Sequence, residues 1–391
     1  MSAYPAEAKN FRLLGHDPSA AYGGGSLVEI HRGHAYVAAV GSSSYHGPEG
    51  FTVHDVSDPT RPRKVAEVKS PWGVHSHKLR IVGDDLLYVS AELLPDAVGK
   101  ARPGMMIFDI STPSAPKEVG FFDLPGGGPH RFGVDNDRAL AFIPNDAEGW
   151  NNRVVWTVDI SDPLKPRPIS TWGLPWQKTD GVGVKADVRP ADLTTILHGP
   201  PIVRGNRMFA AFWGGGVAII DCTDFSNMSL VGHVNWSPPF PGRSHTACPI
   251  GDKPYLVVTD EGKQGHKWWD SQFMWVLDMR EETKPFPVAS FFPERKKYYE
   301  RPGRFGAHNI VEDIPATGPY ANLVFLTYFN AGLRAVDVSD PIEPREVGYY
   351  VPAAVEGQAA IQSNDVGRDD RGLLYIIDRG GSGMHIVEYL G

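Results

Sequence analysis

One repeated pattern constrains the fold of this chain more than any other feature of its sequence. An apolar residue, an acidic residue and a second apolar residue precede Ser/Thr-Asp-Pro-x-x-Pro, and an apolar run follows. Clear copies are HDVSDPTRPRKVAEV (54–68), FDISTPSAPKEVGFF (108–122), VDISDPLKPRPISTW (158–172) and VDVSDPIEPREVGYY (336–350), with degenerate copies at 220–234 and 277–291 and a half-copy, HIVEYLG, at the end. Repeats of this length predict stacked structural units that bury a continuous core.

The acidic residues of the pattern recur every 50 to 62 residues, which is the length of one four-stranded antiparallel blade. They are Asp55, Asp109, Asp159, Asp221, Asp278, Asp337 and Glu388. The spacing therefore predicts an all-β, seven-bladed β-propeller that forms a single domain over residues 1–391. With 43 Gly and 34 Pro in 391 residues, the chain suits short strands and tight turns rather than helices. The Asp residues of the pattern are predicted to form turns, not to catalyse.

The last repeat is incomplete, because only half a copy surrounds Glu388 at the end of the chain. Residues 10–15, NFRLLG, have the character of an outermost strand. We expect this N-terminal strand to complete the seventh blade and close the ring, which would remove the free sheet edges.

The repeats resemble those of the LVIVD-repeat family of β-propellers, and the resemblance extends over nearly the whole chain. It implies a propeller fold. It does not imply one activity, because propellers support many chemistries.

Histidines recur at one position of successive repeats. The position lies nine residues before the start of the second predicted strand of each blade. It is occupied by His77, His130, His198 and His245, and His308 stands at the matching place of the sixth blade. The first and seventh blades have Gly25 and Asn364 there. This position begins the innermost strand, so the side chains should converge on the propeller axis. A structural histidine in every blade is the alternative, but it predicts histidine in the first and seventh blades too. We therefore predict a divalent transition metal (Mn, Fe, Zn or Cu) on the axis.

Long loops on the same face supply candidate catalytic and substrate-binding residues. His75, His266 and Glu261 are candidate catalytic residues, with Glu49, Glu148 and Asp260 as further candidate acids or bases. Candidate substrate-binding residues are Arg131, Arg243, Arg304, Trp150, Trp268 and Asn364. Arginines beside aromatic side chains favour a small anionic substrate with aromatic or unsaturated character.

The histidine cluster favours a metal-dependent enzyme with lyase-like acid/base chemistry, since a metal uses three or four ligands and a spare imidazole can act as a base. The arrangement is similar in fold and site type to propeller lyases such as the oligogalacturonate lyases. It is also similar to carotenoid-cleavage-type oxygenases and to selenium-binding/methanethiol-oxidase proteins. An iron or copper oxygenase or oxidase is therefore one alternative, and a protein-binding scaffold is the other.

Charge and cysteine content limit the partners. The net charge is −8 with no long basic run, so nucleic acid is not an expected partner. No apolar run is long enough to span a membrane, and no signal peptide is recognisable. Two cysteines, Cys222 and Cys248, do not make a disulfide framework. We expect a cytoplasmic protein that binds a small molecule and not a membrane; the sequence does not indicate its oligomeric state.

Overall fold

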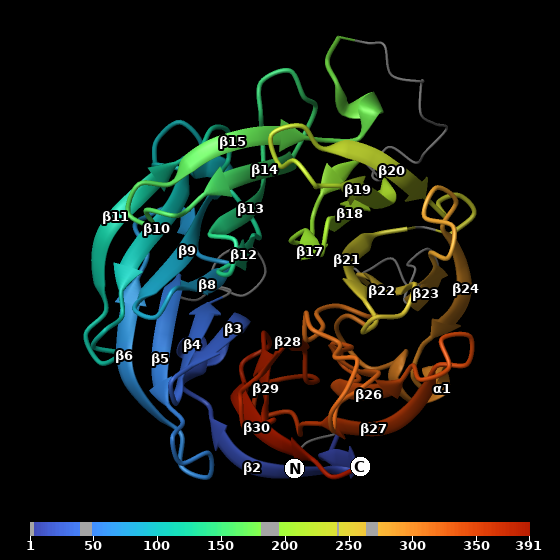
Figure 1. Cartoon of the computed structure of the whole chain (residues 1–391). Helices are drawn as coiled ribbons and strands as arrows, with labels where there is room; N and C mark the ends of the chain where they lie inside the picture. The colour runs from blue at the N-terminus through green and yellow to red at the C-terminus, as the bar shows by residue number, and fades with distance from the viewer. Residues whose placement is uncertain (1–3, 40–48, 181–194, 241, 263–272) are drawn as a thin grey trace.

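Seven antiparallel sheets surround a central axis in the computed structural model, as Figure 1 shows. The structure describes residues 4–39, 49–180, 195–240, 242–262 and 273–391. The predicted seven-bladed β-propeller is therefore confirmed. Within the described residues, no helix has the length and apolar character to cross a membrane.

Each blade runs from an inner strand at the axis to an outer strand at the rim. Blade 1 contains β3 (Gly25–His31), β4 (His34–Ala39), β5 (Gly50–Asp55) and β6 (Arg63–Lys69). Blade 2 contains β7 (Val74–His75), β8 (Leu79–Val82), β9 (Leu86–Leu93), β10 (Gly104–Asp109) and β11 (Lys117–Asp123). Blade 3 contains β12 (Gly133–Asp135), β13 (Leu140–Asn145), β14 (Val154–Asp159) and β15 (Arg167–Trp172). Blade 4 contains β16 (Ile196–Leu197), β17 (Ile202–Arg204), β18 (Arg207–Trp213), β19 (Gly216–Asp221) and β20 (Ser229–Val234).

The remaining blades contain both ends of the chain. Blade 5 contains β21 (Ser244–Pro249), β22 (Tyr255–Asp260), β23 (Met274–Asp278) and β24 (Phe286–Phe291). Blade 6 contains β25 (Leu323–Thr327), β26 (Leu333–Asp337), β27 (Arg345–Val351) and β1 (Glu7–Lys9). Blade 7 contains β28 (Ser363–Arg368), β29 (Leu374–Asp378), β30 (Gly383–Tyr389) and β2 (Phe11–Asp17). Short helices lie at Ala20–Gly23, Pro95–Ala97, Pro175–Gln177 and, as α1, at Arg295–Tyr298.

The repeated acidic residues form turns, as predicted. In blade 1, Oδ1 of Asp55 accepts the backbone N–H of Ser57 at 3.1 Å, which caps the turn between the third and fourth strands. Asp109, Asp159, Asp221, Asp278 and Asp337 accept the N–H two residues ahead in the same way, at 2.8–2.9 Å. Glu388 differs, because its carboxylate pairs with Arg12 of β2 instead.

Apolar side chains between neighbouring blades form the core. Phe51 and Val53 of blade 1, for example, share a buried cluster with Val89 and Met106 of blade 2. Because every blade packs against two neighbours, the ring is a closed series of sheet-on-sheet contacts.

The N-terminal segment closes this ring, as predicted, and does so on two blades. β2 pairs with β30 from Phe11↔Tyr389 to Asp17↔Met384, so it is the outer strand of blade 7. β1, which the sequence did not reveal, adds a strand to β27 of blade 6. The strand β2 therefore lies beside the C-terminal strand β30, as Figure 1 shows.

A buried hydrogen bond between a carboxylate and an imidazole joins the closing strand to blade 1. Oδ2 of Asp17 lies 2.7 Å from Nδ1 of His54, and Nε2 of His54 lies 2.8 Å from Oγ1 of Thr52. Burial by itself would raise the pKa of Asp17, but the hydrogen bonds from His54 and Ser19 outweigh it and lower the pKa to about 2. Asp17 is therefore ionised in the folded protein at every pH above that value.

This pair predicts part of the acid stability of the propeller. The pKa of Asp17 falls from 3.8 to about 2 on folding. Its stabilisation is therefore complete above pH 4 and lost as the pH falls towards 2. Asp17→Asn should lower the free energy of unfolding by about 2 kcal/mol at pH 7 and should flatten its decline between pH 4 and pH 2. Chemical unfolding at several pH values measures this, with the exposed Asp252→Asn as the matched control. Equal declines in wild type and Asp17→Asn would contradict the assignment.

Candidate functional site

The inner strands are irregular at the position where the histidines recur. β21 shifts its register between Ser244 and Thr246, so the displaced residue is His245, and β28 shifts in the same way at Asn364. In blades 2 and 4 the inner strand is divided, into β7 and β8 around His77 and into β16 and β17 around His198. Such bulges redirect side chains, and here they accompany the side chains that gather at the axis.

The histidines form a continuous arc around one end of the axis, as the repeat register predicted. Successive ring centroids are separated by 5.2 Å (His75–His77), 3.9 Å (His77–His130), 5.2 Å (His130–His198), 4.8 Å (His198–His245) and 4.5 Å (His245–His308). All except His245 line one cavity of about 470 Å³, which we call the axial pocket. The five predicted ligands and His75 are thus neighbours in space.

Their potential ligand atoms fall into two groups rather than one ring. The first group is His75, His77 and His130, and the second is His198, His245 and Glu261; within each group the atoms lie within 4.8 Å of one another. Among the described residues these two groups have no member in common. Glu261, predicted as a catalytic residue, thus lies among potential metal ligands.

Each imidazole of the first group has a partner on Nδ1. His75 faces the carboxylate of Glu49 at 3.0 Å, and His130 faces that of Glu92 at 2.6 Å. Nδ1 of His77 lies 2.8 Å from Oγ of Ser26, in the bulge of blade 1. A partner on Nδ1 fixes the ring and leaves Nε2 as the ligand nitrogen, which is the usual arrangement behind metal-binding histidines. These residues fit a divalent transition metal.

The second group is organised around Glu261. Its Oε1 accepts a hydrogen bond from Nη1 of Arg304 at 2.6 Å. The carboxylate lies 3.7 Å from Nε2 of His198 and 3.7 Å from Nε2 of His308. Nη1 of Arg131 lies 2.7 Å from Nε2 of His245, and Nη2 of Arg131 lies 3.3 Å from Glu312.

Burial and neighbouring charges set the protonation states of the cluster. Burial opposes protonation of His75, but the carboxylate of Glu49 outweighs it and raises the pKa of this ring. Burial lowers the pKa of His77, His198 and His245 well below 6.5, so these rings are neutral at pH 7. Burial opposes ionisation of Glu261, but its electrostatic interactions with His308, Arg304 and His198 outweigh this effect and lower its pKa to about 2. Neutral imidazoles and ionised carboxylates are the forms that bind metal ions.

The predicted substrate-binding residues separate into different places. Arg304 lines the axial pocket. Arg131 is buried against His245 and Asn309, away from the pocket lining. Arg243 is also buried, and its carbonyl accepts the N–H of Glu261. His266 and Trp268 lie outside the described residues.

Two more of the predicted substrate-binding residues make other contacts. The side chain of Asn364 is already used, because Nδ2 donates to the carbonyl of Ser26 at 2.6 Å and Oδ1 accepts from Arg379 at 3.1 Å. Trp150 lines a separate pocket with Trp172 and Lys178.

A third candidate, the acid Asp260, is structural. Its Oδ2 accepts indole N–H groups from Trp236 at 2.8 Å and Trp275 at 2.7 Å. The carboxylate therefore joins two tryptophans of the core.

Several pocket residues were missed by the sequence analysis. Glu92, Trp213 and Arg379 stand at or just after the end of the second strand of their blades, as Glu261 does in blade 5. The end of a second strand lies beside the start of an inner strand in an antiparallel sheet. The residues at the ends of the second strands therefore form a second set of equivalent positions, and this set could have been recognised in the sequence. Arg153, which pairs with Glu92 at 2.5 Å, does not belong to this set.

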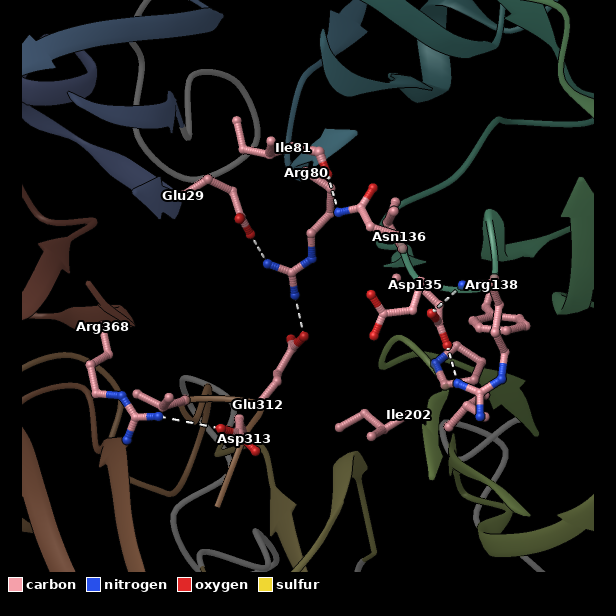
Figure 2. A pocket seen from close by; sticks show the side chains of 17 residues that line it. Glu29, Arg80, Ile81, Asp135, Asn136, Arg138, Ile202, Glu312, Asp313 and Arg368 are labelled. Carbon is pink, nitrogen blue, oxygen red and sulfur yellow. Dashed lines mark hydrogen bonds and ion pairs between the residues drawn. The ribbon is translucent and has the colours of Figure 1, made fainter. Parts of the chain in front are cut away.

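A larger pocket, of about 640 Å³, lies where the inner strands end (Figure 2). Its three arginines are paired within the protein: Arg80 with Glu29 and Glu312, Arg138 with Asp135, and Arg368 with Asp313. None of the potential metal ligands grouped among the described residues lines this pocket.

Fold and site together define a seven-bladed β-propeller with a buried histidine cluster at one end of its axis. The LVIVD-repeat model matches residues 98–123, 202–235 and 310–351, so the chain carries LVIVD repeats. No curated protein matches the sequence.

Solved structures share the fold at low sequence identity. A protein from Lactobacillus plantarum is 11% identical, with a TM-score of 0.65 over 90% of this chain and 91% of the other. The periplasmic gluconolactonase PpgL of Pseudomonas aeruginosa is 12% identical, with a TM-score of 0.63 over 89% and 90%. The structure of U3-55K is 10% identical, with a TM-score of 0.60 over 96% and 98%. These similarities concern the fold alone.

Proposed function

We propose that this propeller is a metal-dependent enzyme in which His75, His77 and His130 hold a divalent transition metal. One observation carries the proposal. Each of these rings has a partner on Nδ1, at Glu49, Ser26 or Glu92, and one nitrogen of each ring lies within 4.8 Å of a nitrogen of each of the other two. Two carboxylates behind three imidazoles favour a cation at this place. Binding another protein would not require three neighbouring imidazoles that each have a partner on Nδ1.

The substrate is a small anion that binds in the axial pocket. Arg153, Arg304 and Arg379 line this cavity of about 470 Å³. Arg153 and Arg304 are held in place by Glu92 and Glu261, at 2.5 and 2.6 Å. Positioned guanidinium groups recognise carboxylates through paired hydrogen bonds, so a small carboxylate suits the site. The gluconolactonase among the fold relatives is an enzyme, but at 12% identity its substrate does not transfer.

The chemistry we propose is lyase-like proton removal. A bound divalent ion polarises a carboxylate or carbonyl and makes the neighbouring proton more acidic. His308 lies in the pocket lining on the second-group side, and its Nδ1 donates to the carbonyl of Asn364 at 2.7 Å. Its Nε2 is therefore the acceptor nitrogen that would take the proton. Because burial lowers the pKa of His308 to about 3, the Glu261 carboxylate, 3.7 Å from Nε2, would have to stabilise the imidazolium that forms.

Metal content tests the proposal. Wild-type protein, loaded with Mn²⁺, Fe²⁺, Zn²⁺ or Cu²⁺ and desalted, should retain at least about one ion per chain. His77→Ala/His130→Ala should lower the affinity of the first group more than about 100-fold, because two of three ligands are lost. Elemental analysis and isothermal titration measure both quantities, with His34→Ala as the control, because His34 is a half-buried histidine of β4 that does not line the axial pocket. Wild type that retains none of the four metals would overturn the proposal.

The reaction class has its own test. Proton removal consumes no oxygen, so a small carboxylate that the loaded enzyme converts should be converted at the same rate without oxygen. An oxygen electrode during turnover measures this. Stoichiometric oxygen uptake would place the protein among the oxygenases or oxidases and would contradict the lyase-like mechanism, while leaving the metal site in place.

A further inference from the structure

We propose that a second divalent ion binds at His198, His245 and Glu261, on the other side of the axial pocket from the first. This inference rests on the proposed function and deepens it, because it makes the centre binuclear.

Spacing within the second group is that of ligands around one ion. Nε2 of His198 and Oε2 of Glu261 are 3.7 Å apart, which exceeds the length of a hydrogen bond. Two ligand atoms that each lie about 2.1 Å from a tetrahedral or octahedral ion are separated by roughly 3.0–3.5 Å. The observed separation therefore leaves room for an ion between the two side chains after a shift of a few tenths of an ångström. A ring nitrogen of His245 lies within 4.8 Å of both. Nη1 of Arg131 lies 2.7 Å from Nε2 of His245, and Oγ1 of Thr246 lies 3.0 Å from its Nδ1, so the Arg131 side chain has to move aside before His245 can bind an ion.

A hydrogen bond to one oxygen of Glu261 fixes the orientation of its carboxylate, as is usual for a carboxylate that binds a metal ion. Glu261 is 6% exposed, and its Oε1 accepts from Arg304 at 2.6 Å, which leaves Oε2 facing His198. Its backbone N–H donates to the carbonyl of Arg243 at 3.0 Å. His198 is held against Trp213, with ring centroids 4.4 Å apart and planes 9° from parallel. Both side chains are thus positioned before any ion arrives.

The charges next to each ligand group predict which group has the higher affinity for a divalent ion. Arg131 and Arg304 contact the second group, and only Glu261 and Glu312 offset them. The first group has Glu49 and Glu92 on its rings, and Arg153 pairs with Glu92. The charges of Arg131 and Arg379 also act on His77, without a hydrogen bond to it among those described. Because cations repel the incoming ion, the second group should bind the weaker of the two ions.

A binuclear centre narrows the substrate class. His130 and His198, one from each group, both line the axial pocket, with ring centroids 5.2 Å apart. Paired ions favour a substrate with two oxygen donors close together. A carboxylate with a hydroxyl or carbonyl on the adjacent carbon has this chemistry.

Titration of the metal-free protein with Zn²⁺, followed by calorimetry and elemental analysis, tests the second site. Wild type should bind two ions per chain with affinities at least about 10-fold apart. Glu261→Gln should keep the tight ion and lose the weak one, whereas His77→Ala should lose the tight one. Glu118→Gln, an exposed acid on β11, is the matched control and should bind two. If Glu261→Gln does not fold, His198→Gln tests the same site.

The outcomes separate this inference from the proposed function. One ion in wild type that Glu261→Gln retains would overturn the second site and leave the first intact. One ion that Glu261→Gln loses and His77→Ala keeps would overturn the two-site assignment and move the only ion to the second group. No bound ion in wild type would overturn both.

Discussion

Closure of seven blades around one axis is the constraint on which this site depends. A closed ring brings the starts of the inner strands together, although their residues lie far apart in the sequence. The first ligand group comes from blades 2 and 3, and the second from blades 4 and 5. No single blade can build either group. The outer strand β2 and the buried Asp17–His54 contact join blade 7 to blade 1 and close the ring. Although both lie away from the axis, the arrangement of the ligand groups at the axis depends on them.

Burial gives the cluster its chemistry. In water, an imidazole exchanges protons with the solvent near pH 6.5, and its ring rotates freely. Here desolvation keeps the rings of His77 and His198 neutral, and Glu92 holds the ring of His130 in one orientation. Buried polar groups of this kind are costly unless they are satisfied. On the proposed function, a metal ion would satisfy the ring nitrogens that face the pocket.

Much of this architecture was predictable from the sequence, because a repeat gives the same position several times. The Asp-containing turns set the blade count, and counting back from the second strands found His77, His130, His198 and His245. The closing strand followed from the missing half-repeat. The short strand β1 was not predictable, since three residues carry no pattern.

The side-chain pairing within the site was less predictable. Asn364 occupies the ring register, but its amide is used by Ser26 and Arg379, and only the fold shows this. The division into two groups depends on local bulges, as at His245, which shift a side chain without changing the residue count. Glu92 belonged to a register at strand ends that becomes visible once those ends are known.

Location of the ion is the most direct test of the central claim, that the first group is a metal centre. Crystals of protein loaded with Zn²⁺, measured on both sides of the zinc absorption edge, give an anomalous map that places the ion independently of its affinity. We predict a peak about 2.1 Å from Nε2 of His75, His77 and His130. A map with no peak within bonding distance of these three nitrogens, in crystals grown with excess Zn²⁺, would contradict the claim.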